Sequence, residues 1–388
     1  MTDLYLSAPG IVCPLGAALA PVAEALFAGH SGLVSQDGLL AGRSTWVGAI
    51  TAALPAVPSR LERLDCRNNR ILMLALDQIA PAIDAAKARH GAARVGVVLG
   101  SSTAGIDKGE LALKSWQQEG QLPADFHYEV QTLGSVARFA AQYLGLEGPC
   151  YSLSTACSSS GKAFASAQRL IAAGLADAVV VGGVDSLCRL TLNGFAALES
   201  IAPGPCAPFT EGRQGISIGE GAAVFLLSKA PGAVRLAGVG ESSDGYHISA
   251  PDPAGGGARR AMDQALAQAG IEAAQIDYVN LHGTGTPKND EMEGHLMAGY
   301  FPHRPWVSTS KAQVGHALGA AGALEAAFCY LALTQDRLPP QLWRGEPDSQ
   351  LPALRFTAPN QQAPVRYAMS NSYAFGGSNV SVILAHEP

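Results

Sequence analysis

The chain has 388 residues, of which 48% are hydrophobic and 15% are charged, so a large part of it must be buried in one or more cores. Its net charge of −6 argues against nucleic-acid binding, which usually requires a basic footprint. The chain contains no run of about 18 uncharged apolar residues, so we expect no membrane span.

The cysteines and the N-terminal residues indicate the compartment. Seven cysteines are scattered along the chain, and no two of them form a C-x-x-C pair. We therefore expect neither a disulfide framework nor a zinc site, and a reducing compartment fits best. The N-terminal residues include Asp3 and Pro9 and lack the basic-then-apolar form of a signal peptide. We predict a cytoplasmic protein.

Strands and helices alternate in the first part of the chain. Residues 68–88 carry apolar side chains at helical spacing, and the apolar run at 94–100 is typical of a strand covered on both faces. Residues 103–126 are harder to interpret, and we expect them to cap the site with a helix and a loop. The other elements predicted here are strands at 4–6, 10–12 and 44–53 and helices at 22–28 and 132–144.

The alternation continues to the C-terminus. Helices are predicted at 258–269 and 318–333, and the second is so rich in Ala and Gly that it must pack closely on all sides. Strands are predicted at 178–183, 220–227, 234–240, 276–281, 306–310, 366–370 and 380–384. This order indicates a layered α/β fold with a largely parallel sheet. We predict two α/β halves, residues 1–230 and 231–388.

Cys157 lies in the stretch 154–161, between an extended segment at 149–153 and apolar residues at helical spacing. A thiol at such a strand-to-helix junction lies near the positive end of a helix dipole, which is expected to lower its pKa. A free cysteine considered alone is more often buried and inert. The residues that accompany Cys157 decide between these interpretations.

Two of the accompanying loops follow predicted strands. His282 comes directly after the strand at 276–281 and precedes turn-forming residues at 283–287. A single histidine is more often structural than catalytic, but this one lies beside several glycines. The loop at 371–379 contains Phe375 next to two glycines, where the backbone can approach a ligand.

A third loop places Lys311 and His316 just before the predicted apolar helix. A lysine is almost never fully buried unless it is paired, so a buried Lys311 needs a carboxylate partner. Three acidic residues could supply it: Asp290, Glu293 and Glu325. Each of these loops is a weak signal alone, whereas their combination is specific.

At these residues the chain resembles the elongating β-ketoacyl-acyl carrier protein synthases of the thiolase-fold superfamily. The T-A-C-x-S-G motif of that family is similar to 155–161, with one extra or shifted residue before the glycine. Its H-G-T-x-T-x-x-x-D-x-x-E motif matches 282–293, and its K-x-x-x-G-H-x-x-G-A-A-G motif matches 311–322 without a gap. Its G-F-G-G-T-N motif resembles 374–379, with Ala374 in place of the first glycine and Ser378 in place of the threonine.

Two details narrow this resemblance. The initiating synthases have Asn in place of the second histidine, and degradative thiolases have a second cysteine in the last motif, and this chain has neither feature. The resemblance covers essentially the whole chain. It implies a thiolase-like α/β/α/β/α fold with two similar halves, in which 1–230 carries the nucleophile and 231–388 carries the two histidines and the lysine.

The resemblance also implies a mechanism. Cys157 would accept an acyl chain as a thioester, and the backbone N–H groups of Cys157 and Phe375 would form the oxyanion hole. His282 and His316, as neutral imidazoles, would stabilise the enolate formed when malonyl-acyl carrier protein loses carbon dioxide. Lys311 would orient this network. No metal or redox cofactor is implied.

Supporting roles follow for the neighbouring residues. Glu293 would pair with Lys311 or hold its loop, with Asp290 nearby in the same motif. Thr284 and Thr286 would hydrogen-bond the pantetheine arm of the carrier. Phe375 would act as a gate between acylation and condensation, and Ala374 could stiffen that gate.

The expected partner is an acyl carrier protein, which is acidic and would need a basic docking patch. Four arginines cluster before and within the helix at 68–88, namely Arg60, Arg63, Arg67 and Arg70. They equally fit a solvated helix end. The resemblance implies a homodimer, and a heterodimer is the alternative.

Two alternatives remain at this stage. One is a non-catalytic chain-length factor that pairs with an active synthase, although such subunits usually lack the nucleophile. The other is a Cys/His acyl hydrolase, which does not explain two histidines plus a lysine. The sequence does not determine the length of the acyl chain, nor does it distinguish fatty acid synthesis from polyketide or aryl-polyene synthesis. We expect residues 103–139 and 190–198 to form the pocket wall.

Overall fold

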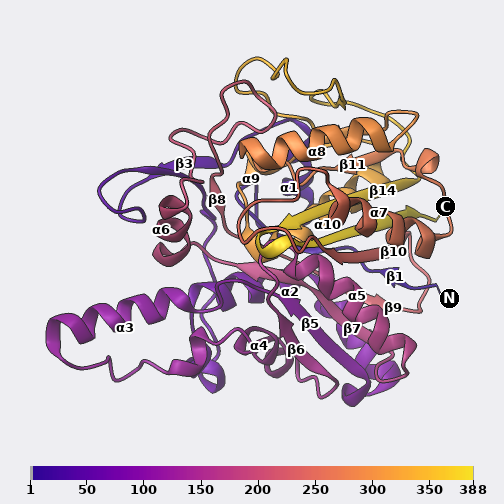
Figure 1. Ribbon diagram of the computed structural model, residues 1–388. Coiled ribbons are helices and arrows are strands. Elements are labelled where there is room, and N and C mark those ends of the chain that lie inside the picture. Colours follow the sequence, from indigo (N-terminus) through magenta and orange to yellow (C-terminus); the bar gives the residue numbers. More distant parts are fainter. Residues whose placement is uncertain (1–2, 388) are drawn as a thin grey trace.

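The computed structural model describes residues 3–387, which form a layered α/β structure around one large mixed sheet (Figure 1). Its strand order is β13-β12-β11-β14-β15-β10-β1-β9-β7-β5-β6, with β2 paired to β9. The strands of this sheet are β1 (Tyr5–Leu6), β2 (Gly10–Val12), β5 (Val95–Gly100), β6 (Cys150–Leu153), β7 (Ala178–Asp185), β9 (Gly221–Ser228), β10 (Val234–Ser243), β11 (Tyr278–Asn280), β12 (Trp306–Ser308), β13 (Arg355–Phe356), β14 (Tyr367–Ala374) and β15 (Ser378–His386). A small second sheet contains β3 (Leu33–Gln36), β4 (Thr45–Gly48) and β8 (Ile218–Gly219).

The prediction of a largely parallel sheet is wrong. Strands β6, β5 and β7 pair in parallel, as do β13, β12, β11 and β14, but every pairing in the centre between β7 and β14 is antiparallel. The apolar runs showed that both faces are covered, which does not determine the direction of the neighbouring strand. Short connections such as the one between β14 and β15 permit only antiparallel pairing.

The two-residue strand β1 links the two parts of the sheet, because it pairs with β9 on one side and β10 on the other. Residue by residue, Tyr5 is opposite Ser228 of β9 and Arg235 of β10. The sheet is thus continuous across the boundary that was predicted between 1–230 and 231–388. The division of the chain into these two halves stays a prediction.

Helices cover both outer faces and fill the space between the two parts of the sheet (Figure 1). Helices α2 and α4 pack on the strands of the N-terminal part, α7 packs on β10 and β15, and α5 and α10 lie in the middle layer in contact with strands of both parts. The α-helices are α1 (Leu19–Phe27), α2 (Arg67–His90), α3 (Ile106–Glu119), α4 (Ser135–Leu144), α5 (Ser159–Ala172), α6 (Arg189–Ala197), α7 (Gly256–Ala269), α8 (Pro287–Tyr300), α9 (Lys311–Val314) and α10 (Ala321–Gln335). The 3₁₀ helices are η1 (Ser59–Leu64), η2 (Ala92–Arg94), η3 (Tyr128–Gln131), η4 (Ala273–Gln275), η5 (Leu318–Ala320) and η6 (Phe375–Gly377). The expected α/β/α/β/α layering is confirmed.

The middle layer explains the composition of α10, which is buried from Ala321 to Leu333. Its side chains belong to the largest core cluster, together with Phe164 of α5 and Phe225 of β9. A helix that is apolar on every side is stable only inside a protein or a membrane. Of the helices within residues 3–387, none is both long and apolar enough to cross a bilayer.

Close packing of α5 on the sheet sets the position of the site. A Cβ added at Gly100 would lie 2.3 Å from the backbone nitrogen of Ser160, and one added at Gly183 would lie 2.6 Å from the Ser160 Cβ. Gly100 at the end of β5 and Gly183 near the end of β7 therefore let the first turn of α5 pack directly against these strands. This contact places the preceding turn, which carries Cys157, at the edge of the sheet.

Residues 103–126 do not cap the site as expected. Helix α3 extends away from the body of the molecule (Figure 1). Ala112 is its one buried residue, whereas Leu111, Leu113 and Trp116 are more than half exposed. The apolar side chains of α3 thus face outward, and no residue of 103–126 lines the cavity described below.

Candidate active site

Cys157 lies on the turn between β6 and α5, and it is 5% exposed. Ala156 before it has a φ of +52°, a left-handed conformation that is uncommon for a residue other than glycine. The hydroxyl of Ser159 holds this turn, since it accepts a hydrogen bond from the Thr155 nitrogen at 2.9 Å and donates to the Ala156 carbonyl at 2.6 Å. The small polar residues around Cys157 therefore stabilise its strained backbone.

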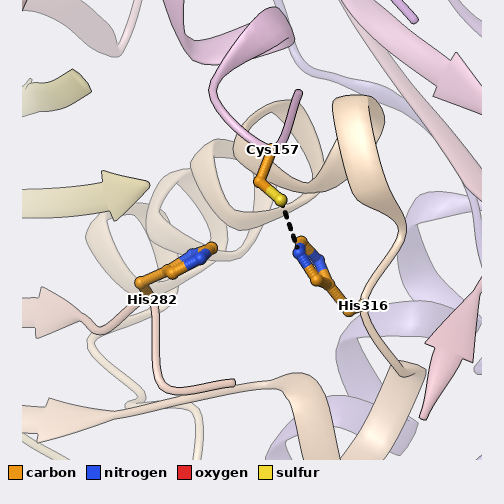
Figure 2. Close-up of side chains that lie close together, drawn as sticks. All are labelled: Cys157, His282 and His316. Carbon is orange, nitrogen blue, oxygen red and sulfur yellow. Dashed lines mark hydrogen bonds between the residues drawn. The ribbon is translucent and has the colours of Figure 1, made fainter. Parts of the chain in front are cut away.

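His316 and His282 approach the thiol from two other loops (Figure 2). The Nε2 atom of His316 lies 2.9 Å from Cys157 Sγ, at hydrogen-bond distance. His282 follows β11, and its ring centre lies 5.4 Å from that of His316, with the ring planes at 84°. Both histidines are 2% exposed. The structure thus brings Cys157 together with two histidines that lie more than a hundred positions after it in the sequence.

Burial makes both imidazoles weak bases. The pKa of His282 lies well below its ordinary value because of burial, with the charge of Lys311 and the neighbouring His316 adding to the effect. The pKa of His316 is lowered in the same direction by burial and then by Lys311. Neutral imidazoles were predicted, and the environment favours them.

The prediction that the pKa of Cys157 is lowered is wrong. Burial raises the pKa of the Cys157 thiol to about 12, although Lys311 and backbone hydrogen bonds from Phe375 and Cys157 itself act to lower it. Desolvation of a thiolate outweighs the helix dipole here. The thiol is therefore protonated at rest, and the adjacent His316 is the group placed to accept its proton. The backbone N–H groups of Cys157 and Phe375 that hydrogen-bond the sulfur are also the groups expected to form the oxyanion hole.

Lys311 is 1% exposed and forms an ion pair with Glu325. Its Nζ also donates to the His282 carbonyl oxygen at 2.9 Å. Of the three candidate carboxylates, Glu325 of α10 is thus the partner of the lysine. The ammonium group links α10 to the backbone of the His282 loop.

Glu293 holds the His282 loop rather than pairing with the lysine. Its carboxylate accepts hydrogen bonds from the backbone nitrogens of His282 at 2.8 Å and Gly283 at 2.7 Å. Burial raises the pKa of Glu293 to about 8, and these two hydrogen bonds act in the opposite direction. Of the two roles considered for Glu293, the geometry fits the second.

Asp290 holds the next part of the same loop. It accepts hydrogen bonds from the backbone nitrogens of Gly285 at 3.1 Å and Phe209 at 2.8 Å. The Nε atom of Arg213, itself buried, lies 3.4 Å from Asp290 Oδ2. Sequence analysis did not identify Arg213, because nothing in its local pattern marks it.

A cavity of about 290 Å³ connects these residues to the surface. Cys157, His282 and His316 line its inner part, and Thr284 and Thr286 are on its wall, with their hydroxyl oxygens 2.9 Å apart. Further lining residues missed by the sequence analysis are Asp244, Ser249, Ala250, Pro251, Lys288 and Tyr373. The cluster of turn-forming residues at 244–255 was the one signal that could have identified a loop here.

Phe375 and Ala374 also line the cavity. The Phe375 ring packs on Phe195 of α6, with ring centres 5.5 Å apart. Ala374 has φ −95° and ψ 155°, a conformation open to any residue, so the alanine is accommodated without strain. Phe195 and Leu198 confirm part of the pocket wall expected at 190–198, whereas no residue of 103–139 lines this cavity.

The ligand atoms of Cys157, His282 and His316 lie within 4.8 Å of one another, so these residues are also the ones that could hold a metal ion. One thiolate and two imidazoles are a donor set that zinc accepts. The expectation that this chain uses no metal stays a prediction.

Comparison with known proteins identifies the family. The model described as the N-terminal domain of β-ketoacyl synthase matches residues 50–233, and that of the C-terminal domain matches residues 233–343. The chain belongs to the β-ketoacyl synthase family. The two matches span the cysteine turn, both histidines and the lysine.

Individual relatives agree with this assignment. Nodulation protein E of Rhizobium meliloti (strain 1021) is 36% identical over 301 residues, 74% of each chain. The 3-oxoacyl-[acyl-carrier-protein] synthase 2 of Staphylococcus aureus is 32% identical over 308 residues, 75% of this chain and 76% of the relative. A solved structure of a ketosynthase (ApeO) in complex with its chain length factor (ApeC) from Xenorhabdus doucetiae matches with a TM-score of 0.96 and 45% identity, covering 100% of this chain and 98% of that one.

The four arginines of this β-ketoacyl synthase have different environments. Arg67 forms an ion pair with the fully buried carboxylate of Glu220, and Arg70 forms two hydrogen bonds of 2.6 Å with Asp65. Arg60 and Arg63 are exposed, and neither has an ion-pair partner within residues 3–387. A docking role for the cluster stays a prediction, and it is better supported for Arg60 and Arg63 than for the two paired arginines.

Proposed function

We propose that this chain is a catalytic β-ketoacyl-acyl carrier protein synthase, which joins an acyl chain held on Cys157 to a malonyl unit held on an acyl carrier protein. The observation that carries the proposal is the 2.9 Å contact between His316 Nε2 and Cys157 Sγ, with His282 in the same buried cavity. Family membership and the named 3-oxoacyl-[acyl-carrier-protein] synthases among the relatives support the same reaction.

Acylation comes first. His316 accepts the thiol proton as the Cys157 sulfur attacks the thioester carbonyl of the acyl-carrier protein. The backbone N–H groups of Cys157 and Phe375 stabilise the oxyanion. The carbon–sulfur bond to the carrier then breaks, and the carrier thiolate leaves and is protonated. The acyl group remains on Cys157 as a thioester.

Condensation follows on the malonyl thioester. The bond to its carboxylate breaks, carbon dioxide leaves, and the enolate oxygen accepts hydrogen bonds from the N–H groups of His282 and His316. The carbanion attacks the acyl carbonyl on Cys157, the bond to the sulfur breaks, and the cysteine thiolate takes up a proton. The product is a β-ketoacyl-carrier protein two carbons longer, and the steps balance without a metal or redox cofactor.

The neighbouring residues position these groups. Lys311, held by Glu325, fixes the His282 backbone. Burial keeps both imidazoles neutral, and the charge of Lys311 adds to this effect. Glu293 and Asp290 hold the loop that carries Thr284 and Thr286, whose hydroxyls are placed to bind the pantetheine arm. Phe375, beside two glycines of positive φ, is the proposed gate.

The intact set of Cys157, His282, Lys311 and His316 favours a catalytic subunit over a non-catalytic chain-length factor. The solved ketosynthase that is 45% identical is described in complex with its own chain length factor. This supports a partner of the same fold for the present chain, either a second copy or a chain-length factor.

A condensation assay tests the proposal. Purified protein, alone and with a candidate chain-length factor, is given a panel of acyl-carrier proteins and malonyl-carrier protein, and products are identified by mass spectrometry. We expect β-ketoacyl products and an acyl adduct on the wild-type chain but not on Cys157→Ala. Free acid released without malonyl consumption would instead indicate a hydrolase, and normal labelling of Cys157→Ala would refute the nucleophile.

A further inference from the structure

The oxyanion hole proposed above is divided between two segments of the chain. The backbone N–H groups of Cys157 and Phe375 both hydrogen-bond the Cys157 sulfur, so they converge on one point. The first belongs to the turn before α5, and the second belongs to η6, which connects β14 and β15 more than two hundred positions later. Two N–H groups act together on an oxyanion only when both lie about 2.7–3.1 Å from it, so the separation of these segments must be fixed.

The contacts of η6 do not fix that separation. Gly376 and Gly377 follow Phe375, and their φ angles of +78° and +75° are ones that glycine adopts at little cost. The hydrogen bonds from Gly376 N to Ile248 O and from Asp244 N to Gly377 O, both of 2.8 Å, join η6 to the loop that begins at Asp244. Neither bond reaches the turn that carries the nucleophile.

A pair of serines joins the two segments. The hydroxyl oxygens of Ser158 and Ser378 lie 3.0 Å apart, at hydrogen-bond distance. Within residues 3–387, the one other hydrogen bond between 155–160 and 374–379 is that of the Phe375 N–H to the sulfur. During acylation the oxyanion takes over this N–H group, so the contact at the sulfur cannot hold the segments together at that step.

Each serine is adjacent to one of the oxyanion donors. Ser158 follows Cys157 directly in the chain. Ser378 lies opposite Ala374 in the pairing of β15 with β14, and Ala374 is the residue before Phe375. A bond between the two serines therefore acts on both N–H groups through short stretches of backbone.

Ser158 is well placed to serve as the anchor. It is fully buried, and its Oγ also lies 2.7 Å from the Thr155 carbonyl oxygen and 3.0 Å from Thr155 Oγ1. A serine hydroxyl can donate one hydrogen bond and accept two, so three contacts use its full capacity. The Ser158 oxygen is thus fixed relative to the turn that carries Cys157.

We propose that the hydrogen bond between Ser158 and Ser378 holds the two N–H groups of the oxyanion hole together, so that both serines are positioning residues for acylation of Cys157. The inference rests on the proposed function, because that function supplies the oxyanion. The family motif noted above has threonine at the position of Ser378, and threonine carries the same hydroxyl.

The test separates acylation, which needs the oxyanion hole, from alkylation of the same sulfur. Iodoacetamide reacts by displacement of iodide at a saturated carbon, so alkylation forms no oxyanion and reports the reactivity and access of the thiol. Acylation uses the acyl-carrier protein that labels the wild type fastest in the condensation assay. Fragment-ion mass spectrometry follows both reactions at Cys157 and distinguishes it from Cys150, which is exposed.

We expect Ser378→Ala to be acylated about 5- to 50-fold more slowly than the wild type, because complete loss of one oxyanion donor costs about 100- to 1,000-fold. Its alkylation should proceed at the wild-type rate. Ser378→Thr keeps the hydroxyl and should be acylated at nearly the wild-type rate, whereas Ser378→Val, which has the shape of threonine, should be as slow as Ser378→Ala. Adding Ser378→Ala to Ser158→Ala should cause no further slowing, because the two residues act through one bond.

Three results would overturn the inference: wild-type acylation of Ser378→Ala, equal slowing of acylation and alkylation, or equal acylation of the Thr and Val variants. Ser381→Ala is the matched control, because Ser381 lies on the same strand and its buried hydroxyl donates to Asn371 Oδ1 at 2.7 Å. Thermal unfolding checks each variant, and the Thr and Val variants decide the question if Ser378→Ala does not fold. Failure of the wild-type chain to form any acyl-cysteine would refute the proposed function instead.

Discussion

Lys311 and Glu325 form an ion pair in which neither side chain is more than 2% exposed. The lysine comes from α9 and the glutamate from α10, so the pair joins the loop of His316 to the helix of the middle layer. Removing one partner of a buried pair leaves an uncompensated charge, whereas removing both does not. This pair therefore influences both the fold and the electrostatics of the histidines.

We predict that Lys311→Met or Glu325→Leu alone lowers the free energy of unfolding by about 3–5 kcal/mol. The double variant should recover most of that loss, because no buried charge then remains. Urea unfolding measures all three. Asp84→Asn is the control, since Asp84 is 73% exposed in its 3.6 Å pair with Lys87 and should change stability by less than about 1 kcal/mol. Additive losses in the double variant would contradict the pairing.

The two histidines should have separable roles. Of the two histidines, His316 is the one that contacts the thiol at hydrogen-bond distance, so His316→Ala should slow acylation of Cys157 by about 100-fold or more. His282→Ala should keep acylation within about tenfold of the wild type while condensation fails. Intact-protein mass follows the first step and β-ketoacyl product the second. Equal losses of acylation in both variants would show that the roles are shared.

The low pKa values of the histidines predict an unusual pH profile. An imidazole whose pKa lies well below 6.5 stays neutral as the pH falls through 6.5, and can still accept the thiol proton. The rate of Cys157 acylation should therefore be flat between about pH 8 and 6.5 and decline only in more acidic buffer. Stopped-flow measurement of the acylation rate at each pH tests this, with circular dichroism used to check that the protein has not unfolded. An acidic limb centred at or above the ordinary histidine value of 6.5 would contradict the burial argument.

The same shift has a consequence for stability. In the unfolded chain the two histidines take up protons near pH 6.5, whereas in the fold they resist protonation. The unfolded state then binds more protons, so these groups make the fold less stable as the pH falls below about 6.5. The free energy of unfolding of His282→Phe should depend less on pH in this range than that of the wild type.

Arg63→Glu tests carrier docking without disturbing the fold. It should raise the Michaelis constant for carrier-bound substrate by a factor of about two to five, as for one exposed ion pair, and the effect should fade at high salt. Pantetheine-linked substrate is the control, because it lacks the carrier surface. Arg67→Glu should instead destabilise the protein, since it sets a carboxylate against buried Glu220. An unchanged constant for Arg63→Glu would remove this residue from the docking surface.

Most elements could be predicted because their signals are local. The apolar run before Gly100 and the helix around Ile79 have strong periodicity, and both appear within a few residues of the predicted bounds. Strand direction was not predictable, because burial of both faces is common to parallel and antiparallel neighbours. The outward course of α3 was missed for a similar reason, since a short amphipathic helix can pack on the site or on another surface.

The candidate site was also predictable only in part. The motifs around Cys157, His282, Lys311 and His316 identified the residues, because each motif is short and contiguous. They did not determine the partner of Lys311 among three carboxylates, because that choice depends on a contact between two helices.

The sequence by itself determined which side chains are candidates for the chemistry, since Cys157, the two histidines and Lys311 each lie in a recognisable local pattern. Only the tertiary structure decided the charge state of those groups and the contacts they make. Desolvation raises the pKa of Cys157 and lowers those of His282 and His316. Burial depends on every layer of the fold, so it cannot be inferred from any one stretch of the chain.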